Sequence, residues 1–287
     1  MPNIQSHAIL GDKNSFNGLG LGAHLEEMTR INVGSFFSDF TSYSDGKLFT
    51  LTDIGTTATN EFNIHPNEFP GVMRIDAGST VATGSEIRGK GSFTAGGFVA
   101  ARDSKDIIYM ARFRKAVAGS GGPAIFCGMC RGATTIGTDG EMIVTDDFMG
   151  FHTSIDSAEL TFQAIRQGTP DVAVNISTGI TMTDNTWVTV GFRAKVTDIS
   201  DDASNGTIEI YVNEETSGLD GIVPQQRIDY LEGPLGPMRR LQDDVVNTAN
   251  AIPDSGSNLN LNACCVNTAA VADLTFDIDF IYVGQER

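Results

Sequence analysis

The chain has 287 residues, of which 40% are hydrophobic, enough to bury one large core or two small ones. Its 36 acidic and 19 basic residues give a net charge of −17, which argues against a nucleic acid or an anionic membrane as partner, because both require concentrated positive charge. The N-terminal residues show no basic and apolar signal segments, and no apolar run approaches the roughly 20 residues that span a bilayer. We therefore expect synthesis in the cytoplasm.

Residues 1–45 are predicted to form an N-terminal arm. The arm starts with a glycine-rich stretch, contains a short candidate helix at His24–Ile31, and includes the aromatic segment Phe36–Phe40. Several of its apolar side chains follow no strand pattern that would place them in a core, so we expect them to bind a partner. These candidates are Ile4, Ile9, Leu10, Phe16, Leu19, Leu21 and Leu25.

Residues 46–287 are predicted to form one β-sandwich domain. Apolar and polar residues alternate most strictly in Trp187–Val196, Thr207–Asn213 and Leu274–Tyr282. Weaker alternation marks Leu48–Leu51, Val72–Ile75, Ile107–Phe113, Ala124–Cys130, Glu159–Ile165 and Leu259–Cys265. Such runs, separated by Gly, Asp, Asn and Ser clusters, are typical of an all-β antiparallel sandwich of two sheets. The alternation places in the shared core Val190, Phe192, Ile208, Ile210, Phe276 and Ile278.

A long loop insertion is predicted at about residues 214–258, between two strong strand patterns. It is rich in proline and contains a second short candidate helix at Pro237–Val246. Its apolar residues are further candidates for partner contacts: Tyr230, Leu231, Leu235, Met238 and Leu241. The arm and the insertion either reach a neighbouring molecule or cover the edge of their own sandwich, and the sequence leaves both alternatives open.

The four cysteines are predicted to be buried, reduced thiols. Cys127 and Cys130 have a spacing that occurs in metal sites, but they lie in a predicted strand, where residues three apart point to opposite faces. The adjacent Cys264 and Cys265 fail as a ligand pair for the same reason. Free cysteine behaves mainly as a small core hydrophobe, so no metal site is expected here.

No catalytic residue is predicted. Glycoside hydrolysis requires two suitably placed carboxylates. The segment most similar to such a pair is Asp277-Ile278-Asp279, which we interpret as part of the polar outer face of the last strand. The four histidines are scattered and are interpreted as surface or structural residues. Trp187, at the start of a central strand, is predicted to lie in the core.

Calcium is the one metal that the sequence leaves open. Three acidic loop segments are of the kind that coordinate Ca²⁺ through oxygen atoms, and none of them is assigned as a site: Asp146-Asp147, Asp198 with Asp201-Asp202, and Asp243-Asp244.

Three segments carry a resemblance to a known family. The strand pair Trp187–Arg193 and Thr207–Asn213, with an Asn-Gly turn before the second strand, resembles the paired strands of concanavalin A-like (laminin G-like) jelly rolls. The terminal segment Phe276–Arg287 is similar to the last strand of such domains in structural proteins of tailed bacteriophages, and Phe36–Phe40 resembles the entry to them. The resemblance covers about residues 36–287.

This resemblance implies a non-enzymatic virion protein, such as a capsid decoration (cement) or tail-associated protein. Such a protein would assemble in several copies, bind other virion proteins and be located in the virion. One alternative is a carbohydrate-binding, lectin-like adhesin that contacts glycans of the host surface. Another is a polysaccharide hydrolase or lyase, which would need two carboxylates about 5–10 Å apart in a cleft.

Overall fold

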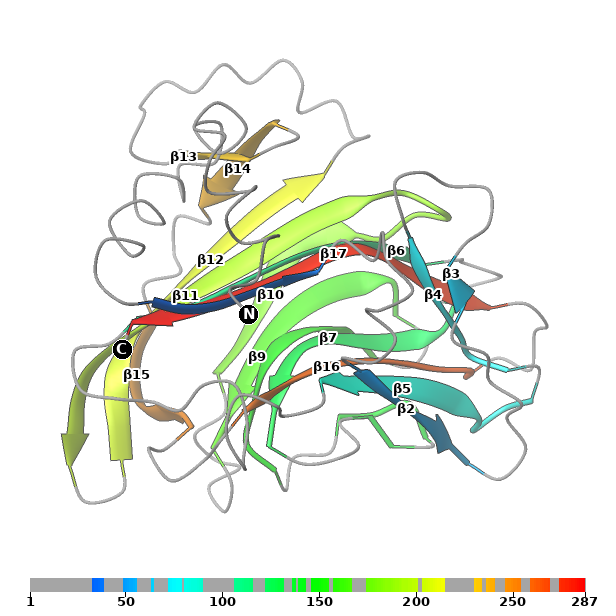
Figure 1. Cartoon of the computed structure of the whole chain (residues 1–287), viewed down its shortest axis with the longest axis horizontal. Coiled ribbons are helices and arrows are strands. Elements are labelled where there is room, and N and C mark those ends of the chain that lie inside the picture. Colours follow the sequence, from blue (N-terminus) through cyan, green and yellow to red (C-terminus); the bar gives the residue numbers. More distant parts are fainter. Residues whose placement is uncertain are drawn as a thin grey trace, which may run out of the picture.

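The computed structural model is a sandwich of two antiparallel sheets with a hydrophobic core between them (Figure 1). It describes residues 33–38, 49–55, 63–64, 72–78, 80–89, 106–115, 122–131, 136–137, 139–142, 146–154, 157–166, 174–200, 203–214, 230–233, 236–240, 246–253, 259–268 and 274–286. The predicted all-β class and the two-sheet architecture are confirmed. The part of the chain that the structure describes holds no helix long and apolar enough to cross a membrane.

The ten-stranded sheet has the order β13 (Tyr230–Gly233), β14 (Gly236–Arg240), β12 (Ala203–Glu214), β11 (Val188–Ser200), β6 (Asp106–Lys115), β17 (Thr275–Glu286), β4 (Met73–Asp76) and β3 (Asn63–Ile64), with β1 (Val33–Ser38) beside β17 and β15 (Val246–Ile252) beside β12. The seven-stranded sheet has the order β10 (Val174–Thr181), β9 (Glu159–Ile165), β8 (Phe148–Thr153), β7 (Ala124–Cys130), β16 (Asn260–Val266), β5 (Gly84–Gly89) and β2 (Phe49–Ile54). Neighbours far apart in sequence, such as β17 and β6, pair directly.

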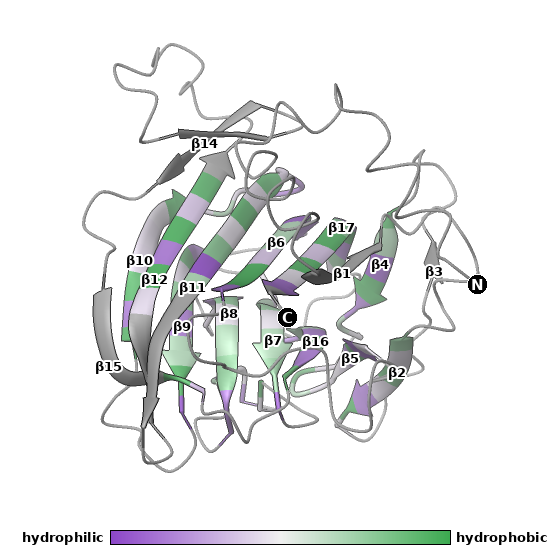
Figure 2. Cartoon of the chain, turned by 60° about the vertical axis from the view of Figure 1, so that its left-hand side comes forward, coloured by the Kyte–Doolittle hydropathy of each residue, from purple (hydrophilic) through white to green (hydrophobic). Residues whose placement is uncertain are grey.

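The alternation seen in the sequence places one face of each of the long strands in the core. Figure 2 shows bands of hydrophobic and hydrophilic residues along β11, β12 and β17. All six predicted core residues are buried in the cluster between the sheets, which confirms the prediction: Val190, Phe192, Ile208, Ile210, Phe276 and Ile278. The Phe192 ring on β11 lies 5.3 Å from that of Phe162 on β9, edge to face, so aromatic contacts link the two sheets.

Lys115 makes a polar link between the sheets at one end of the sandwich. Its side chain is fully buried, and Nζ donates to the Pro123 carbonyl oxygen at 3.2 Å and to Thr153 Oγ1 at 3.1 Å. Thr153 ends β8, so this amine, carried by β6, reaches the opposite sheet. Burial lowers the pKa of Lys115 from 10.5 to about 8.

Two predictions about the segments outside the sandwich were wrong. The 214–258 segment is not one long loop, because it contains β13, β14 and β15, which extend the ten-stranded sheet. The helix predicted at Pro237–Val246 is absent there: residues 236–240 form β14 and residues 246–252 form β15. The predicted arm also contains β1, which pairs with β17, whereas the helix predicted at His24–Ile31 lies outside the described residues.

Candidate functional site

The outer face of the seven-stranded sheet divides into an apolar part and a polar part. The apolar part is a second cluster, in which Phe126, Phe148 and Ile165 pack with Ile136 and Met142. Ile136 and Met142 form a bridge within the β7–β8 connection, so this connection packs against that part of the sheet. The polar part includes Glu86, Arg88 and Asn262 on β5 and β16, and a further group of residues on β8, β9 and β10.

Strand register brings the polar residues together. Gln163 on β9 lies opposite Gly150 on β8 and Asn175 on β10, while Thr161 lies opposite His152 and Ser177. Directly opposite residues are about 5 Å apart, and the two rows are about 7 Å apart along the strands. We call these side chains the polar strip: His152, Thr161, Gln163, Asn175 and Ser177.

Exposure falls across the polar strip from the sheet edge inward. Asn175 and Ser177 on the edge strand are exposed, Thr161 and Gln163 are half-buried, and His152 is 8% exposed. The Ser177 hydroxyl is oriented by two contacts, because it donates to Glu159 Oε1 and accepts from the Gly179 backbone N–H at 3.2 Å. The register of β10 shifts between Ser177 and Ile180, where Gly179 has a φ of +71°.

Three polar atoms of the strip, all in His152 and Gln163, lack the hydrogen-bond partner that a buried polar atom usually has. Both ring nitrogens of His152 and Oε1 of Gln163 are buried without a hydrogen-bond partner among the described residues. Burial lowers the pKa of His152 from 6.5 to about 4, so the imidazole is neutral at neutral pH. Buried polar groups are nearly always hydrogen-bonded, and exceptions of this kind mark places where a water, an ion or a ligand supplies the partner.

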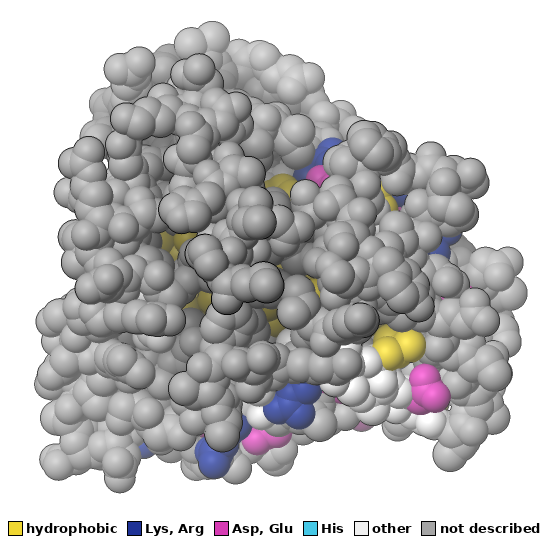
Figure 3. Space-filling view, viewed as in Figure 1, with side chains coloured by type: hydrophobic (Ala, Val, Ile, Leu, Met, Phe, Trp, Pro, Cys, Tyr) yellow, Lys and Arg dark blue, Asp and Glu magenta, His cyan; other side chains and the backbone are white. Residues whose placement is uncertain are grey.

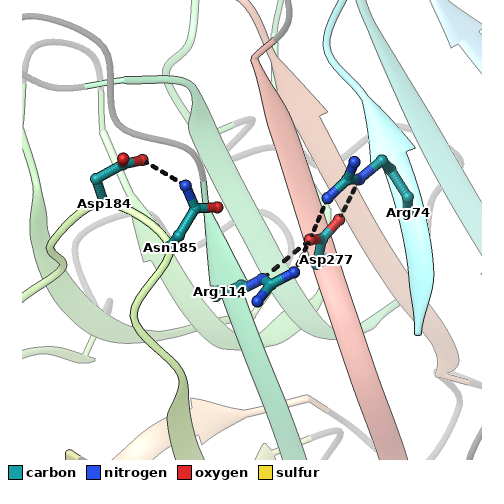
Figure 4. A network of polar contacts seen from close by, with 5 residues as sticks. All are labelled: Arg74, Arg114, Asp184, Asn185 and Asp277. Atoms are coloured by element: carbon teal, nitrogen blue, oxygen red, sulfur yellow. Dashed lines mark hydrogen bonds and ion pairs between the residues drawn. The ribbon is translucent and has the colours of Figure 1, made fainter. Parts of the chain in front are cut away.

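The outer face of the ten-stranded sheet carries a different kind of polar cluster (Figure 4). Asp277 on β17 lies between Arg74 on β4 and Arg114 on β6, and its carboxylate accepts from both guanidinium groups. The next pair along β17 joins Asp279 to Arg112 at 2.6 Å. In places on the face seen in Figure 3, basic and acidic side chains of described residues lie beside one another. These pairs connect neighbouring strands, and we interpret them as structural.

Trp187 belongs to this outer cluster, so its predicted core position was wrong. It precedes Val188, which points into the core, and strand alternation therefore turns Trp187 outward. The half-buried ring has the guanidinium carbons of Arg112 and Arg114 at 4.5 and 4.4 Å from its centroid. The outward position predicted for Asp277 and Asp279 is confirmed by the same ion pairs.

The predicted geometry of the cysteines is also confirmed. Cys127 and Cys265 lie in the core between the sheets, whereas Cys130 and Cys264 lie in the outer apolar cluster. All four cysteines are buried and form no disulfide, and burial raises the pKa of Cys127 to about 12. The residues of each sequence pair therefore point to opposite faces of their sheet.

The described residues form no metal site at the three acidic loop segments. Asp147 is buried and pairs with Arg131 at 3.5 Å, while the side chains of Asp198, Asp201, Asp202, Asp243 and Asp244 lie outside the described part. Among the described residues no three His, Cys, Asp or Glu side chains gather as a metal-binding group.

The predicted partner-binding residues remain predictions. The structure gives the backbone of Tyr230, Leu231 and Met238, which lie in the β13–β14 hairpin, with Leu231 opposite Met238. The others lie outside the described residues: Ile4, Ile9, Leu10, Phe16, Leu19, Leu21, Leu25, Leu235 and Leu241.

The sequence matches no protein-family model, and the comparison with curated proteins finds no relative. Solved structures do share the fold. Peanut lectin superposes with a TM-score of 0.52 at 9% identity, covering 88% of this chain and 97% of the lectin. The winged bean acidic lectin, solved with methyl-α-D-galactose, gives 0.52 at 9% identity over 89% of this chain and 99% of that one. The PL-14 alginate lyase of Aplysia kurodai gives 0.51 at 10% identity, with coverages of 88% and 98%. The chain therefore has the concanavalin A-like jelly-roll fold of legume lectins.

Proposed function

We propose that this protein is a non-enzymatic, lectin-like glycan-binding protein and that the polar strip is its binding surface. The observation that carries the proposal is that two neutral side chains, His152 and Gln163, have buried polar atoms without a partner among the described residues: both ring nitrogens of His152 and Oε1 of Gln163. They adjoin the exposed Asn175 and Ser177 at the sheet edge. Amide, hydroxyl and imidazole groups can both donate to and accept from sugar hydroxyls.

The solved structures with this fold support a sugar ligand by analogy. One was determined with a bound galactoside, and another is named for its action on alginate. Fold similarity alone does not assign a function, so the local groups of the polar strip must carry the argument.

We propose binding without hydrolysis because the described acidic groups near the strip are not placed as a catalytic pair. Hydrolysis of a glycosidic bond uses two carboxyl groups about 5–10 Å apart. The described carboxylate beside the strip is Glu159, which is exposed and accepts a hydrogen bond from Ser177. Glu86, on the same sheet face, lies on β5, with β16 and β7 between it and β8. We therefore expect a bound glycan not to be hydrolysed.

Glycan-array screening followed by calorimetric titration with the best ligand tests this proposal. Gln163→Leu and Asn175→Ala should each weaken binding about 5- to 30-fold, because each removes a hydrogen bond worth about 1–2 kcal/mol. A matched control is Thr189→Val on the ten-stranded sheet, which removes another buried oxygen without a partner among the described residues. It should bind like the parent. Equal losses in the control and the strip variants, or no glycan bound at all, would refute the proposal.

We also propose, on the resemblance of Phe276–Arg287 and Phe36–Phe40 to phage proteins, that the binding domain is carried on a virion. In that setting it would act as an adhesin, with the arm and the 214–258 segment contacting other virion proteins. The expected result is co-sedimentation with intact particles at a fixed copy number. Recovery only in the soluble fraction of infected cells would contradict a place in the virion and would leave glycan binding as a separate question.

A further inference from the structure

We infer that the polar strip selects neutral glycans and discriminates against polyuronates and other acidic polysaccharides. This inference rests on the proposed function and adds the ligand class to it. It follows from the charges around the strip, on its own strands and on the rest of the same sheet face.

The strip itself has hydrogen-bonding groups but no positive charge to pair with an acidic ligand. Its side chains are an imidazole, two hydroxyls and two amides. His152 is buried and is bordered by Thr161 and Phe126 on the neighbouring strands, so no carboxylate lies directly opposite to keep it protonated. A sugar hydroxyl can serve the atoms of this imidazole and of Gln163 as donor or acceptor.

The nearest described carboxylate lies at the end of the strip. Glu159 precedes Thr161 by two residues on β9, so its exposed side chain lies on the same face, where it accepts from Ser177. An acidic group of a ligand bound over Ser177 would lie beside this carboxylate. Two like charges so close repel one another, whereas a neutral ligand is not penalised.

The described cations are too distant or already engaged. On the same sheet face Arg88 is separated from Gln163 by β16, β7 and β8, about 19 Å at the usual strand spacing, and it donates to the Arg131 carbonyl oxygen. Arg166 follows the end of β9, about 10 Å along the chain from Gln163, and is half-buried in an interaction of its own. The net charge of −17 adds long-range repulsion of any polyanion.

The test compares neutral oligosaccharides with oligouronates of equal length, titrated into the full chain at pH 7 and at low and physiological salt. We expect the neutral series to bind at least tenfold more tightly. Glu159→Gln should raise the ratio of uronate to neutral affinity about fivefold. Glu141→Gln, which removes an exposed carboxylate from the β7–β8 connection, should change that ratio less than twofold, although it changes the net charge equally.

Three outcomes would overturn the inference. Uronates that bind as tightly as neutral sugars would refute the selectivity while leaving glycan binding intact. Equal effects of Glu159→Gln and Glu141→Gln would show that net charge, and not the local carboxylate, sets any preference. Absence of binding to both series would refute the proposed function together with the inference.

Discussion

Replacing Asp277 by asparagine is expected to lower the free energy of unfolding by about 3–5 kcal/mol, the usual cost of breaking a buried ion pair by removing one partner. The carboxylate is 1% exposed, and both its oxygens accept from Arg74 at 2.7 Å. Arg114 donates to one of them at 2.9 and 3.0 Å. A neutral amide would remove the carboxylate charge that pairs with both guanidinium groups, one from β4 and one from β6. Urea unfolding at pH 7 measures the loss.

Asp279→Asn is the matched control for this prediction. Asp279 lies on the same strand and pairs with Arg112 at 2.6 Å, but its side chain is 18% exposed. Solvent screens an accessible pair of this kind, so we expect a loss of about 1 kcal/mol or less. Equal losses in the two variants would mean that burial of Asp277 between two arginines has no special role in holding β4, β17 and β6 together.

Acidification is expected to destabilise the protein through His152. The pKa of this imidazole is about 4 in the folded chain and 6.5 as its ordinary value, so between these pH values the unfolded chain binds a proton that the folded chain does not. Stability therefore falls as the pH falls from 6.5 to 4, by about 3 kcal/mol for this group alone.

The variant His152→Phe isolates that contribution, because it keeps an aromatic ring and removes the titrating atoms. Carboxylates contribute to acid denaturation in both proteins, so the relevant quantity is the difference between their curves of unfolding free energy against pH. That difference should grow between pH 6.5 and 4 and stay level above pH 7. Parallel curves throughout would show that His152 is solvated and titrates normally.

Strand prediction from the sequence was clearest where one face of a strand is buried. It also found β7 and β16, which are buried on both faces, but it missed other strands that lack alternation. β11, β12 and β17 have clear alternation because their outer residues are mostly polar. β8 is buried on both faces, so its sequence Phe148–Thr153 has no two-residue period. In β10 the shifted register after Ser177 interrupts the pattern. Trp187 was predicted in the core from its place at the start of a central strand, but its position next to the inward-pointing Val188 turns it to the outer face.

The candidate site was not predictable from the sequence, although its residues were visible there. His152 and Gln163 are eleven positions apart and belong to no motif. Only the register of β8 against β9 brings them onto one sheet face, and that register depends on the pairing of the whole strands. Their buried atoms have no partners among the described residues, and this too depends on packing. Neither the composition nor the spacing of residues in the sequence indicates it.

The irregular course of β10 has a consequence for behaviour at high concentration. β10 is the last strand of its sheet, and a straight strand there would offer a ladder on which a second molecule could polymerise. The ladder is interrupted after Ser177, and the Thr178 hydroxyl donates to the Leu160 carbonyl oxygen at 2.6 Å within the same chain. Both features disfavour edge-to-edge pairing of copies at this margin, beside the polar strip.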